Sequence, residues 1–231
     1  MMNLTREHLI LVELLLRSVS HSFGALALFV PSKAVATTPD WRGEVAGVVW
    51  VVSTLPMLFY VLAHPALLRR RIPRAEQIPE QKIIKALFAL GGMVMYGGSF
   101  VSWGFDYHLA SIPIPVALLG DLLIAGGSLL IWQVFRINAY ASSIVTVESE
   151  QPVISTGLYA LVRHPLYSAS LLLLIGVPVA LGALWVLVFL PFVLAVIIWR
   201  LTNEEKYLST HLPGYQDYCA RVTHRLIPFI W

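Results

Sequence analysis

The sequence predicts an all-α integral membrane protein with about six transmembrane helices, the last two forming a C-terminal helical hairpin. Of its 231 residues, 58% are hydrophobic and only 13% are charged, whereas an ordinary soluble domain has about 25% charged residues. The mean hydropathy is +0.75. Apolar runs recur at the length of about 20 residues that crosses the roughly 30 Å hydrocarbon layer of a bilayer. These observations exclude a disordered chain and a disulfide-built secreted domain, and they argue against a soluble enzyme.

Four predicted spans precede the last apolar stretch. They are residues 9–30, 45–63, 86–105 and 112–135. The first contains Glu13 and Arg17. Because these charges interrupt the long apolar core that a signal peptide needs, we expect a retained helix there. The fourth is interrupted only by Asp121, which we expect either to line a tunnel or to pair with Arg17.

The last apolar stretch, residues 165–199, contains no charged residue. At about 1.5 Å per residue it is too long for a single crossing. Gly182 lies near its middle and favours a tight turn. We therefore expect a helical hairpin made of residues 167–181 and 184–199.

Basic residues predict the orientation, because loops rich in Lys and Arg stay in the cytoplasm. They gather in the loop after the second span, in the loop before Pro165 and in the tail: Arg69, Arg70, Arg71, Arg74, Lys82, Lys85, Arg136, Arg163, Arg200, Lys206, Arg221 and Arg225. The opposite side has only Lys33 and Arg42. Both termini and the long loops are therefore expected to be cytoplasmic, at the inner membrane if the protein is bacterial.

The chain divides into residues 1–136, which are nearly all span and short loop, and residues 137–231, which concentrate polar and aromatic side chains. In the second part, residues 157–167 read Gly-Leu-Tyr-Ala-Leu-Val-Arg-His-Pro-Leu-Tyr. They put a cation, an imidazole and two phenols at the mouth of the hairpin. Tyr and Arg are also common interfacial anchors, so this cluster alone does not decide between an anchor and a site.

A second polar cluster follows the hairpin, where Arg200 is four residues before Glu204 and Glu205 comes next. On a continuing helix Arg200 and Glu204 share one face. A salt-bridged helix end would explain this pair, but a turn at Gly182 brings both clusters together on the cytoplasmic side. Ionisable groups near membrane depth tend to mark functional sites.

The tail contains a third cluster, with Tyr215 and Tyr218 three residues apart. This spacing is typical of one face of an interfacial amphipathic helix, and the two tyrosines could equally be part of the site. Residues 227–231 can fold back over the site or onto lipid. Cys219 is the only cysteine, which makes an internal disulfide impossible and a structural role more natural than a catalytic one. The histidines form no metal-binding motif, no nucleic-acid groove is indicated, and no dinucleotide-binding glycine motif follows a strand.

The order G-x-Y-x-x-x-R-H-P-x-Y, an apolar hairpin, R-x-x-x-E-E-x-x-L, paired tyrosines and a terminal V-x-x-x-x-P-F-I resembles the isoprenylcysteine carboxyl methyltransferase (ICMT) family, and small bacterial members in particular. The resemblance covers residues 138–231. It departs from the family pattern at Ala169, where glycine is frequent, and at Leu212, which with Pro-Gly replaces a Phe-Gly pair. Both departures concern the methyl acceptor more than the cofactor.

The resemblance implies an integral membrane methyltransferase that uses S-adenosylmethionine, releases S-adenosylhomocysteine and binds its cofactor in a cytoplasmic pocket. The residues that it implies for the cofactor are Gln151, Pro152, Val153, Ile154, Tyr159, His164, Pro165, Leu166, Tyr167 and Glu204. Arg200 would bind the acceptor. Arg200, Glu204 and Glu205 are the candidate catalytic residues, and no metal is implied.

The acceptor implied by the family is the carboxylate of an isoprenylcysteine-like molecule, entering from the bilayer. A carboxylate needs no general base, so the protein mainly aligns and desolvates it. A thiol or amine would need one, and Glu205 would be the first candidate. Two alternatives remain: a phospholipid or small-molecule N- or S-methyltransferase, and a sterol-type NADPH reductase. The reductases show Asn and Gly-Glu where this chain has Leu166, Ala169 and Ser170.

Overall fold

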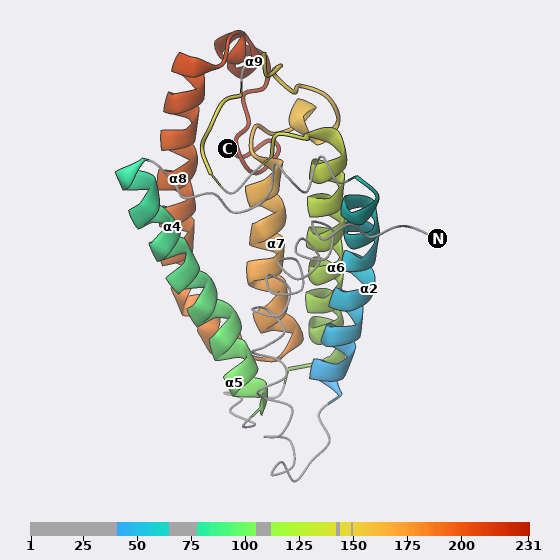
Figure 1. Cartoon of the computed structure of the whole chain (residues 1–231). Coiled ribbons are helices and arrows are strands. Elements are labelled where there is room, and N and C mark those ends of the chain that lie inside the picture. The colour runs from blue at the N-terminus through green and yellow to red at the C-terminus, as the bar shows by residue number, and fades with distance from the viewer. Residues whose placement is uncertain (1–40, 65–77, 105–111, 142–143, 149) are drawn as a thin grey trace, which may run out of the picture.

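The computed structural model of the chain describes residues 41–64, 78–104, 112–141, 144–148 and 150–231 (Figure 1). All regular structure in this part is helical, which confirms the predicted all-α class. The elements are α2 (Arg42–Ala63), α4 (Pro79–Gly92), the π-helical turn η2 (Met93–Gly97), α5 (Gly98–Gly104), α6 (Ile114–Ile137), the 3₁₀ turn η3 (Gly157–Ala160), α7 (Pro165–Ala180), the 3₁₀ turn η4 (Leu184–Phe189), α8 (Leu190–His211) and α9 (Tyr215–Arg221).

Four of the described helical segments are long and apolar enough to cross a membrane: Arg42–Ala63, Pro79–Gly104, Ile114–Ile137 and Leu184–His211. A shorter apolar helix, Pro165–Ala180, stands between the last two. These five segments correspond to five of the six predicted spans. The sixth, residues 9–30, lies outside the described residues, so the total of six stays a prediction.

Several basic residues that were expected in loops or in the tail lie inside helices. Lys82 and Lys85 lie in the first turns of α4, and Arg136 lies in the last turn of α6, instead of in loops. Arg200 and Lys206 are inside α8, which continues to His211. The reason is that helical hydrogen bonding does not depend on side-chain polarity, so a helix can continue beyond the apolar layer.

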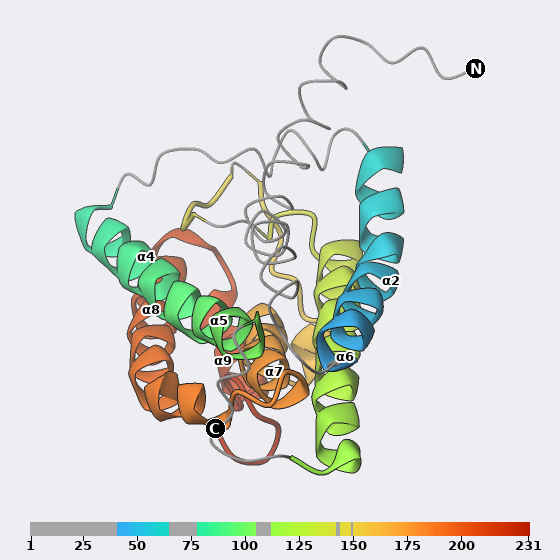
Figure 2. The same ribbon diagram turned by 90° about the horizontal axis from the view of Figure 1, so that it is seen from below.

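Helices α6 and α7 pack against each other most closely, and α2 covers the other side of α6 (Figures 1 and 2). Small residues make the close approach possible. A Cβ atom on Gly120 would lie 2.2 Å from the Ala180 backbone nitrogen, and one on Gly127 would lie 2.9 Å from the Ala169 carbonyl oxygen. The backbone of Ala169 can therefore lie close to α6 because its neighbour there is a glycine.

The chain reverses direction after α7, at Gly182, whose φ of 75° is the left-handed conformation that glycine adopts easily. The two arms then separate along their length. Helix α7 packs mainly on α6, whereas α8 packs on α4, and Leu174 and Ile197 meet in a core shared with Met95 of the π-helical turn (Figures 1 and 2). That this pair of helices crosses the membrane as a hairpin stays a prediction.

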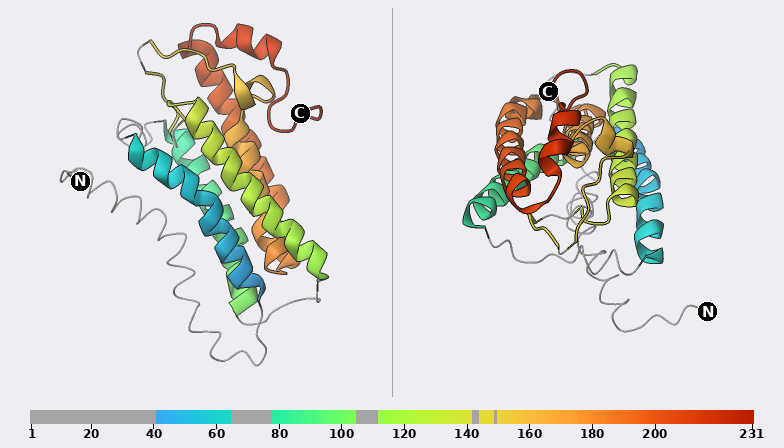
Figure 3. Two further views of the ribbon diagram at one scale, coloured as in Figure 1. Left: turned by 90° about the vertical axis from the view of Figure 1, so that its right-hand side faces the viewer. Right: turned by 90° about the horizontal axis from the view of Figure 1, so that it is seen from above.

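The polar segments gather at one end of the bundle (Figure 3). There α8 ends, α7 begins, and the chain segment 138–164, α9 and the C-terminal tail lie together above the helices (Figure 3). A small apolar cluster holds this end together: Leu212, Tyr215, Tyr218 and Val222, with Val147, Val153, Leu208 and Cys219 packed against them. This arrangement brings sequence segments before and after the apolar stretch into one site.

Candidate functional site

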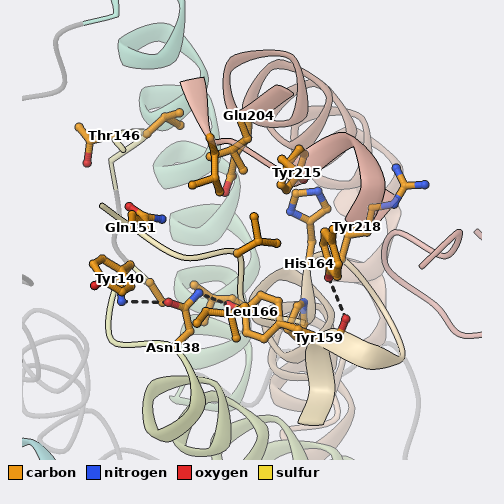
Figure 4. Close-up of a pocket in the computed structure, with 18 of the residues that line it drawn as sticks. Asn138, Tyr140, Thr146, Gln151, Tyr159, His164, Leu166, Glu204, Tyr215 and Tyr218 are labelled. Carbon is orange, nitrogen blue, oxygen red and sulfur yellow. Dashed lines mark hydrogen bonds between the residues drawn. The ribbon is translucent and has the colours of Figure 1, made fainter. Parts of the chain in front are cut away.

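A pocket with an empty volume of about 850 Å³ opens at this polar end of the bundle (Figure 4). Its lining comes from the segment 138–154, from η3, from the start of α7, from the end of α8 and from α9. Its lining includes both polar groups and apolar side chains, as in a site for a ligand with both kinds of surface.

All ten residues that the family resemblance implies for the cofactor line this pocket: Gln151, Pro152, Val153, Ile154, Tyr159, His164, Pro165, Leu166, Tyr167 and Glu204. Figure 4 shows Gln151, Leu166 and Glu204 around the same space. Arg200 and Glu205, the other two candidates, are not part of the lining. The structure thus brings the cofactor candidates together, while their roles stay a prediction.

One wall of the pocket is built around Tyr159. Gly157 begins η3 with a φ of 59°, a conformation that suits glycine and lets the chain turn toward the pocket. The Tyr159 hydroxyl accepts a hydrogen bond of 2.9 Å from the Asn138 side chain, and the Tyr159 carbonyl accepts one of 2.8 Å from the Tyr218 hydroxyl (Figure 4). Burial raises the pKa of Tyr218 above its ordinary range, so this hydroxyl remains a donor at physiological pH.

On the opposite side, a directed chain of hydrogen bonds joins Arg200 to Glu204 through Tyr167. The Arg200 Nε group donates to the Tyr167 hydroxyl over 3.2 Å, and this hydroxyl donates to Glu204 Oε2 over 2.9 Å. Tyr167 and Glu204 line the pocket, whereas Arg200 lies behind them, 7% exposed. A phenol between a cation and a carboxylate is oriented by both, because it accepts from one and donates to the other.

Arg200 also contacts α4, because its Nη1 group donates a hydrogen bond to the side-chain oxygen of Gln81. Gln81 is only 2% exposed and lies in the first turns of α4. One residue earlier, Glu80 accepts a hydrogen bond of 3.0 Å from the Trp199 indole. The start of α4 is thus attached to α8 at the level of Arg200.

Glu205 holds a cluster of three basic side chains. Its Oε1 accepts from Arg163 Nη1 at 3.0 Å and lies 3.2 Å from His164 Nε2, and its Oε2 accepts from Arg225 Nε at 3.0 Å. Both carboxylate oxygens are therefore engaged by basic groups, which makes Glu205 a poor base. This geometry does not favour the expected proton-accepting role for a thiol or amine acceptor, and it favours a structural one.

The same cluster attaches the C-terminal tail to the start of α7. Arg163 donates to the Val222 carbonyl over 2.6 Å and to the Cys219 carbonyl over 3.2 Å. The His164 backbone nitrogen donates to the Arg225 carbonyl over 2.9 Å. Residues 219–225 of the tail therefore lie beside the start of α7. Residues 227–231, which were expected to fold over the site or onto lipid, do not line the pocket, and Phe229 and Ile230 are exposed.

Several pocket residues were not among the predicted site residues. The additional lining includes Asn138, Tyr140, Thr146, Leu208, Leu212, Tyr215 and Tyr218. The spacing of Tyr215 and Tyr218 was a usable signal, because both face the pocket from α9. Burial raises the pKa of Tyr215 above its ordinary range. Gln81 had no signal at all, since a single amide before an apolar run is unremarkable.

Asp121 is not part of the pocket lining. Asp121 is 7% exposed, and its Oδ1 has no hydrogen-bond partner among the described residues. Arg17, its candidate partner, lies outside them, so that pairing stays a prediction. In the described part of the chain, no group of three His, Cys, Asp or Glu side chains is arranged to hold a metal ion.

Comparison with known proteins agrees with the motifs. No curated protein matches the chain. The model of the isoprenylcysteine carboxyl methyltransferase (ICMT) family matches residues 117–210, which include α6, the pocket segment, α7 and nearly all of α8. This match contains both polar clusters and the apolar stretch between them. Residues 117–210 are therefore similar to the ICMT family, the same family that the motifs indicate.

Proposed function

We propose that this protein transfers the methyl group of S-adenosylmethionine to the carboxylate of a lipophilic, isoprenylcysteine-like acceptor. The observation that carries the proposal is the convergence of the ten cofactor candidates on one pocket, with Tyr167 linking that pocket to Arg200. The long apolar helices of the bundle are suited to an acceptor that enters the site from the bilayer. We further propose a cytoplasmic pocket, on the basis of the positive-inside pattern.

The chemistry of the pocket fits the cofactor. S-adenosylmethionine carries an ammonium group, a carboxylate, ribose hydroxyls and an aromatic base around a sulfonium. Glu204 offers a carboxylate for the ammonium or the ribose, and Tyr159 and Tyr215 offer aromatic surface for the base or the sulfonium. Val153 and Leu166 provide apolar walls. When bound, the cofactor supplies a methyl group on positively charged sulfur.

The protein's own contribution is alignment and exclusion of water. With the cofactor bound, in-line displacement would move the methyl group from its sulfur to a carboxylate oxygen of the acceptor, and the products would be a methyl ester and S-adenosylhomocysteine, with no proton to be transferred. Arg200 orients the acceptor carboxylate, and Glu204 orients the cofactor. Tyr167 is hydrogen-bonded to both side chains, so it fixes the position of Arg200 relative to Glu204. Two reactants can be aligned only if the groups that bind them are held in this way.

The first test is cofactor binding by the detergent-purified full chain. S-adenosylhomocysteine and NADPH are titrated separately by calorimetry, with the wild type, Glu204→Gln and the exposed control Asp217→Asn. We expect the wild type to bind S-adenosylhomocysteine but not NADPH. Glu204→Gln should bind at least about tenfold more weakly, because a charge-assisted hydrogen bond is lost. Asp217→Asn should bind like the wild type.

Binding of NADPH alone would replace the proposal by the reductase alternative. A second assay then identifies the acceptor chemistry, with labelled S-adenosylmethionine and three candidate acceptors: a farnesylated cysteine with a free carboxylate, a phosphatidylethanolamine and a small lipophilic thiol. Label in a base-labile methyl ester of the first supports carboxyl methylation. Label on the amine or the thiol alone would instead show an N- or S-methyltransferase.

A further inference from the structure

The start of α4 lies outside the region that matches the family, yet its Gln81 reaches the proposed acceptor residue. The amide is buried, and its oxygen accepts from Arg200 Nη1. Arg200 Nε is held at the same time by the Tyr167 hydroxyl. Two nitrogens of the guanidinium are therefore attached to two different helices, α4 and α7, which determines the plane of the group as well as its position.

The chemical type of the residue at position 81 matters as much as its place. A glutamine oxygen accepts a hydrogen bond without bringing a negative charge, whereas a glutamate at the same place would form an ion pair with the guanidinium. A carboxylate does lie one residue away, but Glu80 bonds the Trp199 indole and is exposed. The acid at the start of α4 thus points away from Arg200, and the neutral amide points toward it.

From this geometry we propose that Gln81 is a positioning residue for Arg200, and that its neutral amide adapts the site to an anionic acceptor. The inference rests on the proposed function and deepens it, because it concerns the charge of the acceptor. The chain Gln81–Arg200–Tyr167–Glu204 then connects α4 to the wall of the cofactor pocket. A charge added at position 81 would compete with the acceptor carboxylate for Arg200.

The test compares three variants of the full chain in detergent: Gln81→Glu, which retains an acceptor oxygen and adds charge; Gln81→Met, which has a similar size and no acceptor; and Glu80→Gln as the matched control. Binding is measured for farnesylated cysteine as the free acid, for its uncharged methyl ester and for S-adenosylhomocysteine. Steady-state kinetics give kcat and the KM for the free acid.

We expect Gln81→Glu to weaken binding of the free acid and raise its KM by roughly tenfold, because a carboxylate placed close to Arg200 repels the acceptor anion and neutralises its partner. Binding of the methyl ester and of S-adenosylhomocysteine should change less than about twofold. Gln81→Met should raise the KM for the free acid several-fold, because Arg200 loses the hydrogen bond that attaches its Nη1 group to α4. Glu80→Gln should match the wild type in every assay.

The outcomes separate this inference from the proposed function. If the wild type binds and methylates the free acid but Gln81→Glu affects acid and ester equally, the amide only packs and the inference is wrong. Unchanged acceptor binding in both Gln81 variants would also overturn it. Loss of S-adenosylhomocysteine binding would show that Gln81→Glu fails to fold. In that case the KM of Gln81→Met for the free acid still tests the inference. Failure of the wild type to use any carboxylate acceptor overturns the proposed acceptor, and this inference with it.

Discussion

At the scale of single residues, the most informative feature is that neighbouring glutamates have different surroundings. Glu204 lines the pocket and accepts from Tyr167, whereas Glu205 binds Arg163, His164 and Arg225. Successive residues on a helix are about 100° apart, so adjacent acids face different partners. The family resemblance implied Glu204 for the cofactor and left Glu205 as a candidate base, and the fold places Glu204 in the pocket lining and Glu205 among the basic groups that hold the tail.

The cluster around Glu205 predicts a defect in the tail rather than in chemistry. Glu205→Gln removes the charge that three basic groups share, and we expect the free energy of unfolding to fall by roughly 3 kcal/mol. The bond between Arg163 and the tail should loosen, so limited proteolysis should cut the chain after Val222 more readily than in the wild type. Asp217→Asn, an exposed acid on α9, is the control.

Residual binding of S-adenosylhomocysteine distinguishes the two roles of this glutamate. If Glu205 has a structural role, the dissociation constant of S-adenosylhomocysteine for Glu205→Gln should be close to the wild-type value, provided that it is measured at a temperature where the variant is folded. A large loss of activity toward a thiol acceptor, with proteolysis unchanged, would instead restore the base role that the sequence suggested.

At the scale of elements, contact between α6 and α7 depends on residues without side chains. A Cβ atom at Gly120 would lie 2.2 Å from the Ala180 backbone nitrogen and 2.8 Å from the Gly176 carbonyl oxygen. Since backbone atoms cannot give way as a flexible side chain can, the helices must separate. Small residues at such contacts are typical of membrane helix pairs, where close backbone approach replaces the hydrophobic effect.

We therefore expect Gly120→Ala to destabilise the protein by about 1–3 kcal/mol, the usual cost of overpacking. Gly126→Ala is the matched control on the same helix, because a Cβ atom there meets nothing within 4 Å. The control should be neutral or slightly stabilising, since alanine favours helix. Thermal unfolding in detergent, followed by circular dichroism, compares the two. Equal melting temperatures would show that the two helices do not depend on this close contact.

At the scale of the whole molecule, the bundle places its polar segments at one end, and the charge pattern predicts that this end faces the cytoplasm. Cysteine labelling tests this orientation. Cys219 is the only cysteine, so Cys219→Ser gives a cysteine-free background. Burial raises the pKa of the Cys219 thiol, so the native thiol is expected to react slowly.

In that background, His108→Cys changes a residue of the loop expected outside, and Gln216→Cys changes an exposed residue of α9. A membrane-impermeant maleimide should label position 108 on intact cells, and position 216 only after permeabilisation. The reverse pattern would show that the protein has the opposite orientation. It would also place the candidate pocket on the outer side, away from a cytoplasmic supply of cofactor.

The sequence by itself determined the membrane class, five of the apolar helices and the two motif segments that meet at the pocket. It could do so because apolar length and composition are local properties that the bilayer requires. Only the tertiary structure decided that α8 packs on α4, that Tyr167 stands between Arg200 and Glu204, and that Gln81 reaches Arg200. These contacts join residues up to 119 positions apart, and they depend on how side chains of different helices fit together, which no local pattern records.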